Sequence, residues 1–361
     1  MTSPRLPRRA VLAGLVVLGL GGCAVGSPEP LAQARVAWRF QAVGDVLGLA
    51  TAEGLVLAGT ARGAVHAVDV ATGSHVWAES LLLRAARPTV IGALLAASDT
   101  TDTHGLQVTT GRRVWQVPGT LVAAGEAAVV VRSRWSESPA AGMLTAHDPA
   151  TGEARWTLPW TGPPPTASLS GDAVHLGGAD RIVTVAAGTG APLWQRPTTA
   201  GPPPVAGRES VFLVDGGALT CLDARTGVVS WQAAGAVSGL LSVVGTLVCA
   251  AGGDRIAAWD AAGGEAVWTW SGDGDPRDLG PAVPVDGPVV LTSGVTVPAA
   301  ADGRRVVVLA LDARSGDLRW RADLPDPAPS GARAAPVATA TGLVVAAAGS
   351  WICAVTTAPG P

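Results

Sequence analysis

Short runs of aliphatic and β-branched residues recur along nearly the whole chain. Residues 55–57 (Leu-Val-Leu) and 129–131 (Val-Val-Val) are typical, and each run is bounded by glycine and other turn-forming residues. No segment combines a helical period of apolar positions with capping residues. Short strands separated by tight turns at even spacing are typical of an all-β repeat protein. The pattern therefore predicts an all-β fold.

One sequence frame repeats in step with these strands. In its first clear copy a strand ends at Asp69, and Gly73 and Trp77 follow. Eight tryptophans mark the copies, and they lie 37–41 residues apart except for a longer last gap. They are Trp38, Trp77, Trp115, Trp156, Trp194, Trp231, Trp268 and Trp320. Such a period predicts small sheets that bury their faces against their neighbours in a ring or stack.

Each residue of the frame has a structural role. The aspartate accepts hydrogen bonds from N–H groups two or three residues on, and the glycine supplies a positive φ in that turn. The tryptophan can lay its indole over a neighbouring blade and donate its ring N–H to a carbonyl. Five copies are complete, with aspartates Asp69, Asp148, Asp223, Asp260 and Asp312 and glycines Gly73, Gly152, Gly227, Gly264 and Gly316. Two weaker copies have Gln107 and Ala186 at the aspartate position.

The frame Ala-x-Asp-x-x-Thr/Ser-Gly-x-x-x-Trp resembles the tryptophan-docking motif of pyrroloquinoline-quinone (PQQ)-like propellers. That group contains quinoprotein dehydrogenases and the lipoprotein of the outer-membrane assembly machinery. The resemblance covers nearly all of residues 36–355. It implies an eight-bladed β-propeller of four-stranded antiparallel blades over residues 36–357, followed by a short tail at residues 358–361.

The two ends of the chain predict how the ring closes. Trp38 is a copy of the last frame position alone, whereas no frame tryptophan follows the last of the strand-like residues 336–338, 342–347 and 349–355. We expect the N-terminal strand to join the last blade, which leaves the ring without a free edge at that point. Seven blades is the alternative, if the weak second copy is not a complete sheet.

Residues 1–22 have the features of a signal peptide. Three arginines precede an uncharged apolar run over residues 10–22, too short for the roughly 20 residues of a membrane-spanning helix. The run ends in Leu-Gly-Gly-Cys, which resembles the bacterial lipobox and implies a diacylglycerol on Cys23. A simple cleavage site with an unmodified Cys23 is the alternative. Arg8 and Arg9 also resemble a twin-arginine signal, so both export routes stay open.

The expected location follows from this N-terminus. We expect residues 23–35 to be a lipid-anchored tether and the propeller to lie on the extracytoplasmic side of the cell membrane. The net charge of −3 gives no reason to expect a nucleic-acid surface. The predicted partners are membrane lipid, through the acylated Cys23, and a protein, peptide or glycan. The propeller itself is expected to be monomeric.

Three further cysteines make an odd number in the mature chain. One disulfide with a free thiol is a possible arrangement. We favour three buried, inert thiols, because Cys221 and Cys353 align with Ala67 and Cys249 aligns with Ala58, which are small strand positions. Cys221 and Cys353 also fall in blades that are not neighbours, which disfavours a disulfide between them.

The residues that would support catalysis are missing from the sequence. The histidines lack metal-ligand spacing, and no serine lies in a nucleophile elbow. Quinoprotein dehydrogenases of the resembled group hold PQQ beside a calcium site that includes an asparagine, and many stack it on a vicinal disulfide. This chain has no asparagine, no adjacent cysteines and no Cys-x-x-Cys-His haem motif. We expect no cofactor, no metal and no catalytic residue; a PQQ-binding, oxidoreductase-like propeller is the alternative.

Two repeats carry extra residues on the face shared by the connections from second to third and from fourth to first strand. Loops of this kind often carry function, although sequence drift explains them equally well. The candidate partner residues are Arg132, Arg134 and Trp135 in the third repeat and Asp273, Asp275, Asp278, Arg304 and Arg305 in the seventh. The three aspartates also suggest calcium, but Arg277 stands where an oxygen ligand belongs.

These observations predict a non-catalytic binding or scaffold propeller whose two long-loop blades face each other across the ring. A purely structural subunit of an envelope complex is a further alternative.

Overall fold

The computed structural model describes residues 34–81, 86–137, 140–199, 203–234, 239–273, 275–284, 289–295, 304–327, 337–340 and 343–357. The chain divides into two units, Met1–Pro30 and Leu31–Pro361. In the described part of the second unit every regular element is a strand, and the strands form eight four-stranded antiparallel sheets. The predicted signal peptide, Cys23 and the tail at residues 358–361 lie outside the described residues.

Blades 1 to 4 follow the chain without crossovers. Blade 1 contains β2 (Val46–Ala52), β3 (Leu55–Thr60), β4 (Ala64–Asp69) and β5 (His75–Ser80). Blade 2 contains β6 (Ala86–Ile91), β7 (Leu94–Ser98), β8 (Asp102–Gln107) and β9 (Arg113–Pro118). Blade 3 contains β10 (Thr120–Ala124), β11 (Val129–Glu137), β12 (Ala140–His147) and β13 (Ala154–Thr161). Blade 4 contains β14 (Thr166–Ser170), β15 (Ala173–Gly177), β16 (Arg181–Ala186) and β17 (Pro192–Pro197).

Blades 5 to 7 have the same topology, and blade 8 differs. Blade 5 contains β18 (Val205–Ala206), β19 (Ser210–Asp215), β20 (Ala218–Asp223) and β21 (Val229–Ala233). Blade 6 contains β22 (Leu240–Val244), β23 (Leu247–Gly252), β24 (Arg255–Asp260) and β25 (Ala266–Ser271). Blade 7 contains β26 (Val283–Pro284), β27 (Val289–Val295), β28 (Arg305–Asp312) and β29 (Leu318–Pro327). Blade 8 combines β30 (Val337–Ala340), β31 (Leu343–Ala348) and β32 (Trp351–Thr357) with the N-terminal β1 (Ala34–Gln41).

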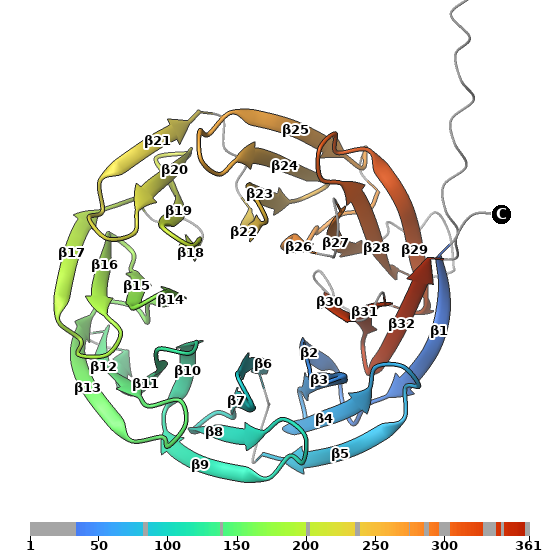
Figure 1. The fold of residues 1–361 in the computed structure, drawn as a ribbon, viewed down its shortest axis with the longest axis horizontal. Helices are drawn as coiled ribbons and strands as arrows, with labels where there is room; N and C mark the ends of the chain where they lie inside the picture. The colour runs from blue at the N-terminus through green and yellow to red at the C-terminus, as the bar shows by residue number, and fades with distance from the viewer. Residues whose placement is uncertain are drawn as a thin grey trace, which may run out of the picture. The chain divides into compact units, whose positions relative to one another are not determined.

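The eight blades of the second unit form a ring, with the first strand of each blade innermost and the fourth outermost (Figure 1). The predicted eight-bladed propeller is therefore confirmed, and the seven-blade alternative is wrong because β6–β9 form a complete second sheet. The predicted closure is also confirmed, since β1 pairs with β32 from the other end of the chain.

The hydrophobic core lies between blades. Every residue of β3 is buried, because both faces of this strand are covered by neighbouring blades. Strands buried on both faces read as continuous apolar runs, which explains the unbroken Leu-Val-Leu at residues 55–57. One cluster joins Leu57 and Trp77 of blade 1 to Leu95 and Leu106 of blade 2. A single blade therefore has no core of its own.

The frame tryptophans cross from each blade to the next. Trp156 on the outer strand of blade 3 donates its Nε1–H to the carbonyl of Ala187 in blade 4, over 2.7 Å. Its indole covers Gly190, where an added Cβ would lie 2.8 Å from the ring. Equivalent bonds of 2.8–3.2 Å join Trp38 to Val70, Trp77 to Val108, Trp115 to Pro149, Trp194 to Ala224, Trp231 to Ala261 and Trp268 to Ala313.

The frame aspartates close the turns between third and fourth strands. Asp69 Oδ1 accepts hydrogen bonds from the N–H groups of Ala71 and Thr72 and from the Thr72 hydroxyl. Gly73 follows with φ of +72°, a conformation that glycine adopts without strain. The Thr72 hydrogen bonds lower the pKa of Asp69, because they stabilise its ionised form. In the weaker second copy, the Gln107 side chain instead accepts a bond from the Thr110 hydroxyl.

Candidate partner-binding face

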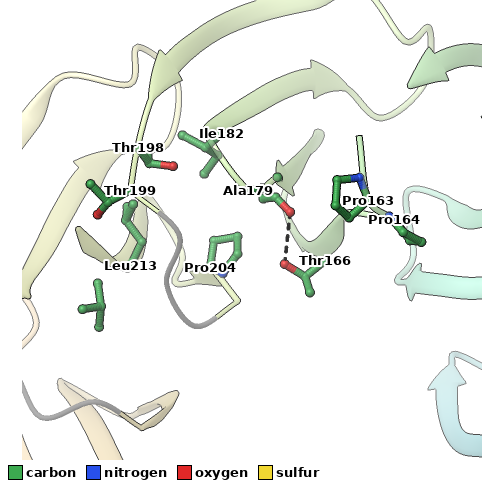
Figure 2. Close-up of a pocket in the computed structure, with 12 residues that line it drawn as sticks. Pro163, Pro164, Thr166, Ala179, Ile182, Thr198, Thr199, Pro204 and Leu213 are labelled. Carbon is green, nitrogen blue, oxygen red and sulfur yellow. Dashed lines mark hydrogen bonds between the residues drawn. The ribbon is translucent and has the colours of Figure 1, made fainter. Parts of the chain in front are cut away.

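Blades 4 and 5 meet at a pocket of about 200 Å³ on the face that carries the connections from second to third and from fourth to first strand. Figure 2 shows Pro163 and Pro164 on one side of this hollow and Thr199 and Leu213 on the other. The pocket is lined by Pro163, Pro164, Thr166, Gly177, Gly178, Ala179, Ile182, Thr198, Thr199, Pro204, Leu213 and Val214.

The lining is uncharged and offers few donors. Among the described residues that form it, none has an ionisable side chain. Its prolines carry no N–H, and the N–H groups of Gly178 and Thr198 already donate to the carbonyls of Arg181 and Asp180. Ile182 and Leu213 contribute apolar surface, while three threonine hydroxyls bring polar atoms. The pocket is suited to an uncharged, largely apolar group.

The proline wall of the pocket is held in place from blade 3. Trp160 is buried and donates its Nε1–H to the carbonyl of Pro163 over 3.0 Å. The guanidinium of Arg181 lies over the Trp160 ring, 4.9 Å from the ring centroid. Gly178 packs tightly here, because an added Cβ would lie 2.9 Å from the Trp160 ring.

The opposite wall is held by a side-chain clamp. Asp215 Oδ1 accepts hydrogen bonds from both the N–H and the hydroxyl of Thr199, each 2.9 Å long. The same hydroxyl accepts a bond from the N–H of Gly216 over 2.7 Å. Thr199 therefore has a defined position at the rim, and the pocket is preformed.

The extra residues of the third repeat do not form the loop that the sequence predicts. They extend β11, which pairs with β12 as far as Glu137 opposite Ala140, with a register shift between Ser133 and Ser136. The prediction of a loop is wrong because strand pairing continues through the insertion. Arg132 is half-buried, and its Nε donates to Thr120 Oγ1 over 2.7 Å. The side chains of Arg134 and Trp135 lie outside the described residues.

This longer hairpin leads directly to the pocket. The N–H of Gly162 donates to the carbonyl of Ala140 at the tip of the hairpin, and Pro163 and Pro164 follow. The structure thus brings the blade-3 candidates and the pocket into one sector.

The acidic residues of the seventh repeat lie in the connection between β25 and β26, and two of them are already paired. Asp278 bonds Arg304 over 3.1 Å, and Asp275 lies 3.7 Å from Arg321. Arg305 begins β28, and residues 296–303 lie outside the described residues. Blade 7 lies across the ring from blade 3 (Figure 1). Because Arg304 and Arg321 pair with two of these aspartates, the loop presents less net negative charge to a partner than the sequence suggests.

The sequence contained an unused signal for the pocket. Proline runs at residues 163–165 and 202–204 precede the first strands of blades 4 and 5. Three of these prolines line the hollow. The run before blade 4 and the run after it both lie on the face of the ring that carries the connections from fourth to first strand. These prolines do not occur at a fixed position of the repeat. Only the packing of blades 4 and 5 shows that the two runs line one pocket.

Cys221, Cys249 and Cys353 are buried in the described structure. Burial raises the pKa of the Cys249 thiol to about 12 and also raises that of Cys221. Two of the sequence alignments are wrong by one position. Cys249 pairs with Ala258 and so corresponds to Leu57, and Ala354, not Cys353, lies opposite Trp38.

Four of the five histidines are buried, and the ring of each forms at least one hydrogen bond within the protein. Burial lowers the pKa of His175 to about 4, where Ser170 and Thr184 hydroxyls contact its two nitrogens. His104 Nε2 lies 3.0 Å from Asp99 Oδ2, and both side chains are buried. Among the described residues no three His, Cys, Asp or Glu side chains gather as metal ligands, including the aspartates of blade 7. Nor does any described helix have the length and apolarity to span a membrane.

Comparison with known proteins adds a family and a fold. The sequence profile of the family described as outer membrane protein assembly factor BamB matches residues 31–179 and 178–360. Curated proteins yield no match. Among solved structures, BamB from Moraxella catarrhalis is 16% identical, with a TM-score of 0.66 over 90% of this chain and 100% of its own.

Two other solved structures have the same fold with different origins. Quinohemoprotein alcohol dehydrogenase ADHIIG from Pseudomonas putida HK5 is 14% identical, with a TM-score of 0.69 over 91% of this chain and 78% of its own. The computationally designed Ika8 protein is 16% identical, with a TM-score of 0.67 over 88% of this chain and 100% of its own. At these identities the likeness shows the fold alone.

Proposed function

Because this chain belongs to the family of the outer membrane protein assembly factor BamB, we propose that it is a membrane-anchored, extracytoplasmic scaffold that binds a protein partner. It performs no catalysis, and the partner contacts the sector formed by the β11–β12 hairpin and the pocket between blades 4 and 5. The partner inserts an uncharged apolar side chain into that pocket.

The neutral, preformed pocket is the observation that carries this proposal. Its volume of about 200 Å³ is below the roughly 300–1,000 Å³ of small-molecule sites, but suits one side chain of a larger partner. Burying a charged group there would be unfavourable, because no lining side chain offers an opposite charge. Binding energy at protein interfaces concentrates on a few side chains seated in such hollows.

A negative charge at the pocket should disrupt the complex. Thr198→Glu should weaken partner binding by about 2 kcal/mol or more, since a carboxylate would face the apolar insert. A photoreactive residue at position 179, where the exposed Ala179 lines the pocket, would report the complex in membrane-bound protein as a covalent adduct of defined mass. Gln195→Glu is the matched control, because it adds the same charge on the exposed outer strand of blade 4. Undiminished adduct in the Thr198 variant would place the partner elsewhere.

The anchor is a separate part of the proposal, and it rests on the signal-like residues 1–22 and Cys23. Cys23→Ala should abolish incorporation of labelled fatty acid, because the only cysteine in the lipobox-like sequence is lost. It should also release the protein from membranes or leave the precursor unprocessed. Cys249→Ala is a suitable control, since that thiol is buried. Equal labelling of the Cys23 variant would contradict acylation at this residue.

A further inference from the structure

The seam of the ring is the place where β1 attaches to blade 1, and it contains two of the five histidines. Trp38 of β1 covers Gly73 and donates its Nε1–H to the Val70 carbonyl over 2.8 Å. Two residues further on, the Phe40 ring contacts both His66 of β4 and His75 of β5, and the three rings form a triangle. Ring centroids are 5.6 Å apart for Phe40 and His66, 5.7 Å for Phe40 and His75, and 5.9 Å for the two histidines.

A hydrogen bond defines the protonation state of His66. The N–H of Val43, just after β1, donates to His66 Nε2 over 3.2 Å. That nitrogen must therefore be unprotonated, and the proton of the neutral ring is on Nδ1, which is buried without a partner. A second proton on Nε2 would face the Val43 N–H and abolish this bond. Only the neutral imidazole is compatible with the closed seam.

We propose that this cluster of Phe40, His66 and His75 is an acid-sensitive latch, in which protonation of His66 releases β1 from blade 1. β1 runs on into β2 of blade 1, but its place in the sheet of blade 8 depends on non-covalent pairing with β32 from the other end of the chain. A protonated His66 would lose its hydrogen bond from Val43 while its ring lies 5.9 Å from that of His75. The contacts of Phe40 and Val43 with His66 would then be lost together.

Among the described residues, no carboxylate acts on His66 to compensate a positive charge there. Its partners in neighbouring strands are Ala58 of β3 and Ala78 of β5. Burial lowers the pKa of His66, and the neighbouring His75 lowers it further. On the same strand, Glu79 pairs with Arg113 of blade 2 over 2.9 Å. Arg39 of β1 stacks over the Trp351 ring in blade 8.

The direction of the pH effect follows from this lowered pKa. In the closed seam His66 stays neutral below its ordinary value of 6.5, whereas in the open seam it takes up a proton there. Opening is therefore favoured as the pH falls below 6.5, and closure is fully stable above it. One pH unit below 6.5 corresponds to an increase in opening of up to about tenfold from this group alone.

Hydrogen–deuterium exchange of the purified full chain tests the latch. From pH 7.5 to 5.5, protection of β1 amides, corrected for intrinsic exchange rates, should fall about tenfold more than protection of β13 amides. His66→Gln should remove this difference, because an amide oxygen can still accept the Val43 N–H without titrating. His75→Gln, at an exposed position, should reduce it and tests the idea if the first variant folds poorly.

His147→Gln is the control, since that buried histidine belongs to blade 3, away from the seam. It should leave the acid response of β1 unchanged. Equal loss of protection in β1 and β13, or an unchanged response of β1 in both seam variants, would overturn the proposal.

Discussion

Replacing Trp156 by alanine should lower the free energy of unfolding by about 3–5 kcal/mol, the usual range for removing a buried tryptophan. Its side chain is 8% exposed, and it packs against Val174 and Leu176 of the next blade. The substitution also leaves the Ala187 carbonyl without its 2.7 Å hydrogen bond. Urea unfolding followed by far-ultraviolet circular dichroism would measure the change.

Two variants calibrate this result. Trp194→Ala removes the same kind of contact at a half-buried position and should be less destabilising. Val114→Ala, at a residue that is 43% exposed, should change stability by no more than about 0.5 kcal/mol. A loss below about 1 kcal/mol for Trp156→Ala would contradict a major role of the docked indole in holding blades 3 and 4 together.

Acidification from pH 7 to 4 should cost about 3 kcal/mol of stability through His175 alone. Burial lowers the pKa of His175 from 6.5 to about 4, so the folded protein keeps this ring neutral over that interval. The unfolded chain binds the proton first as the pH falls. The contribution is therefore complete above pH 6.5 and is lost progressively between pH 6.5 and 4.

The variant His175→Gln should flatten this part of the pH dependence. Glutamine does not titrate and can still bond the hydroxyls of Ser170 and Thr184. Unfolding free energies at pH 7 and 4.5 would be compared with those of wild type and of Thr189→Ser, a conservative change in an exposed turn of the same blade. An unchanged difference between the two pH values in His175→Gln would show that this histidine does not carry the effect.

The fold was predictable because the tryptophan frame records contacts between blades. Trp38 has no copy of the frame before it, so its partner had to lie at the other end of the chain, and β1 indeed pairs with β32. The register of the last strand was harder to predict. Blade 8 lacks the aspartate and glycine that mark the turn elsewhere, and a shift of one residue exchanged Cys353 for Ala354. In a strand such a shift moves a side chain to the other face.

The candidate site was less predictable, for two physical reasons. The insertion around Arg132 has the polar composition of a loop. Its backbone nevertheless pairs with β12 on both sides of the register shift between Ser133 and Ser136. The pocket joins Pro163 to Leu213, residues about 50 positions apart that meet only where two blades pack. Repeats reveal what the blades have in common, whereas a binding site depends on where they differ.

The pairing of Ala34 with Thr357 means that the beginning and the end of the ring lie side by side in one sheet. The blades dock on their neighbours in a similar way around the ring. A circular permutant, with these ends joined and new termini opened in an exposed turn, would keep every strand neighbour. In such a chain β1 and β32 would be joined covalently while His66 kept its place beside Phe40, so acid should release β1 less readily.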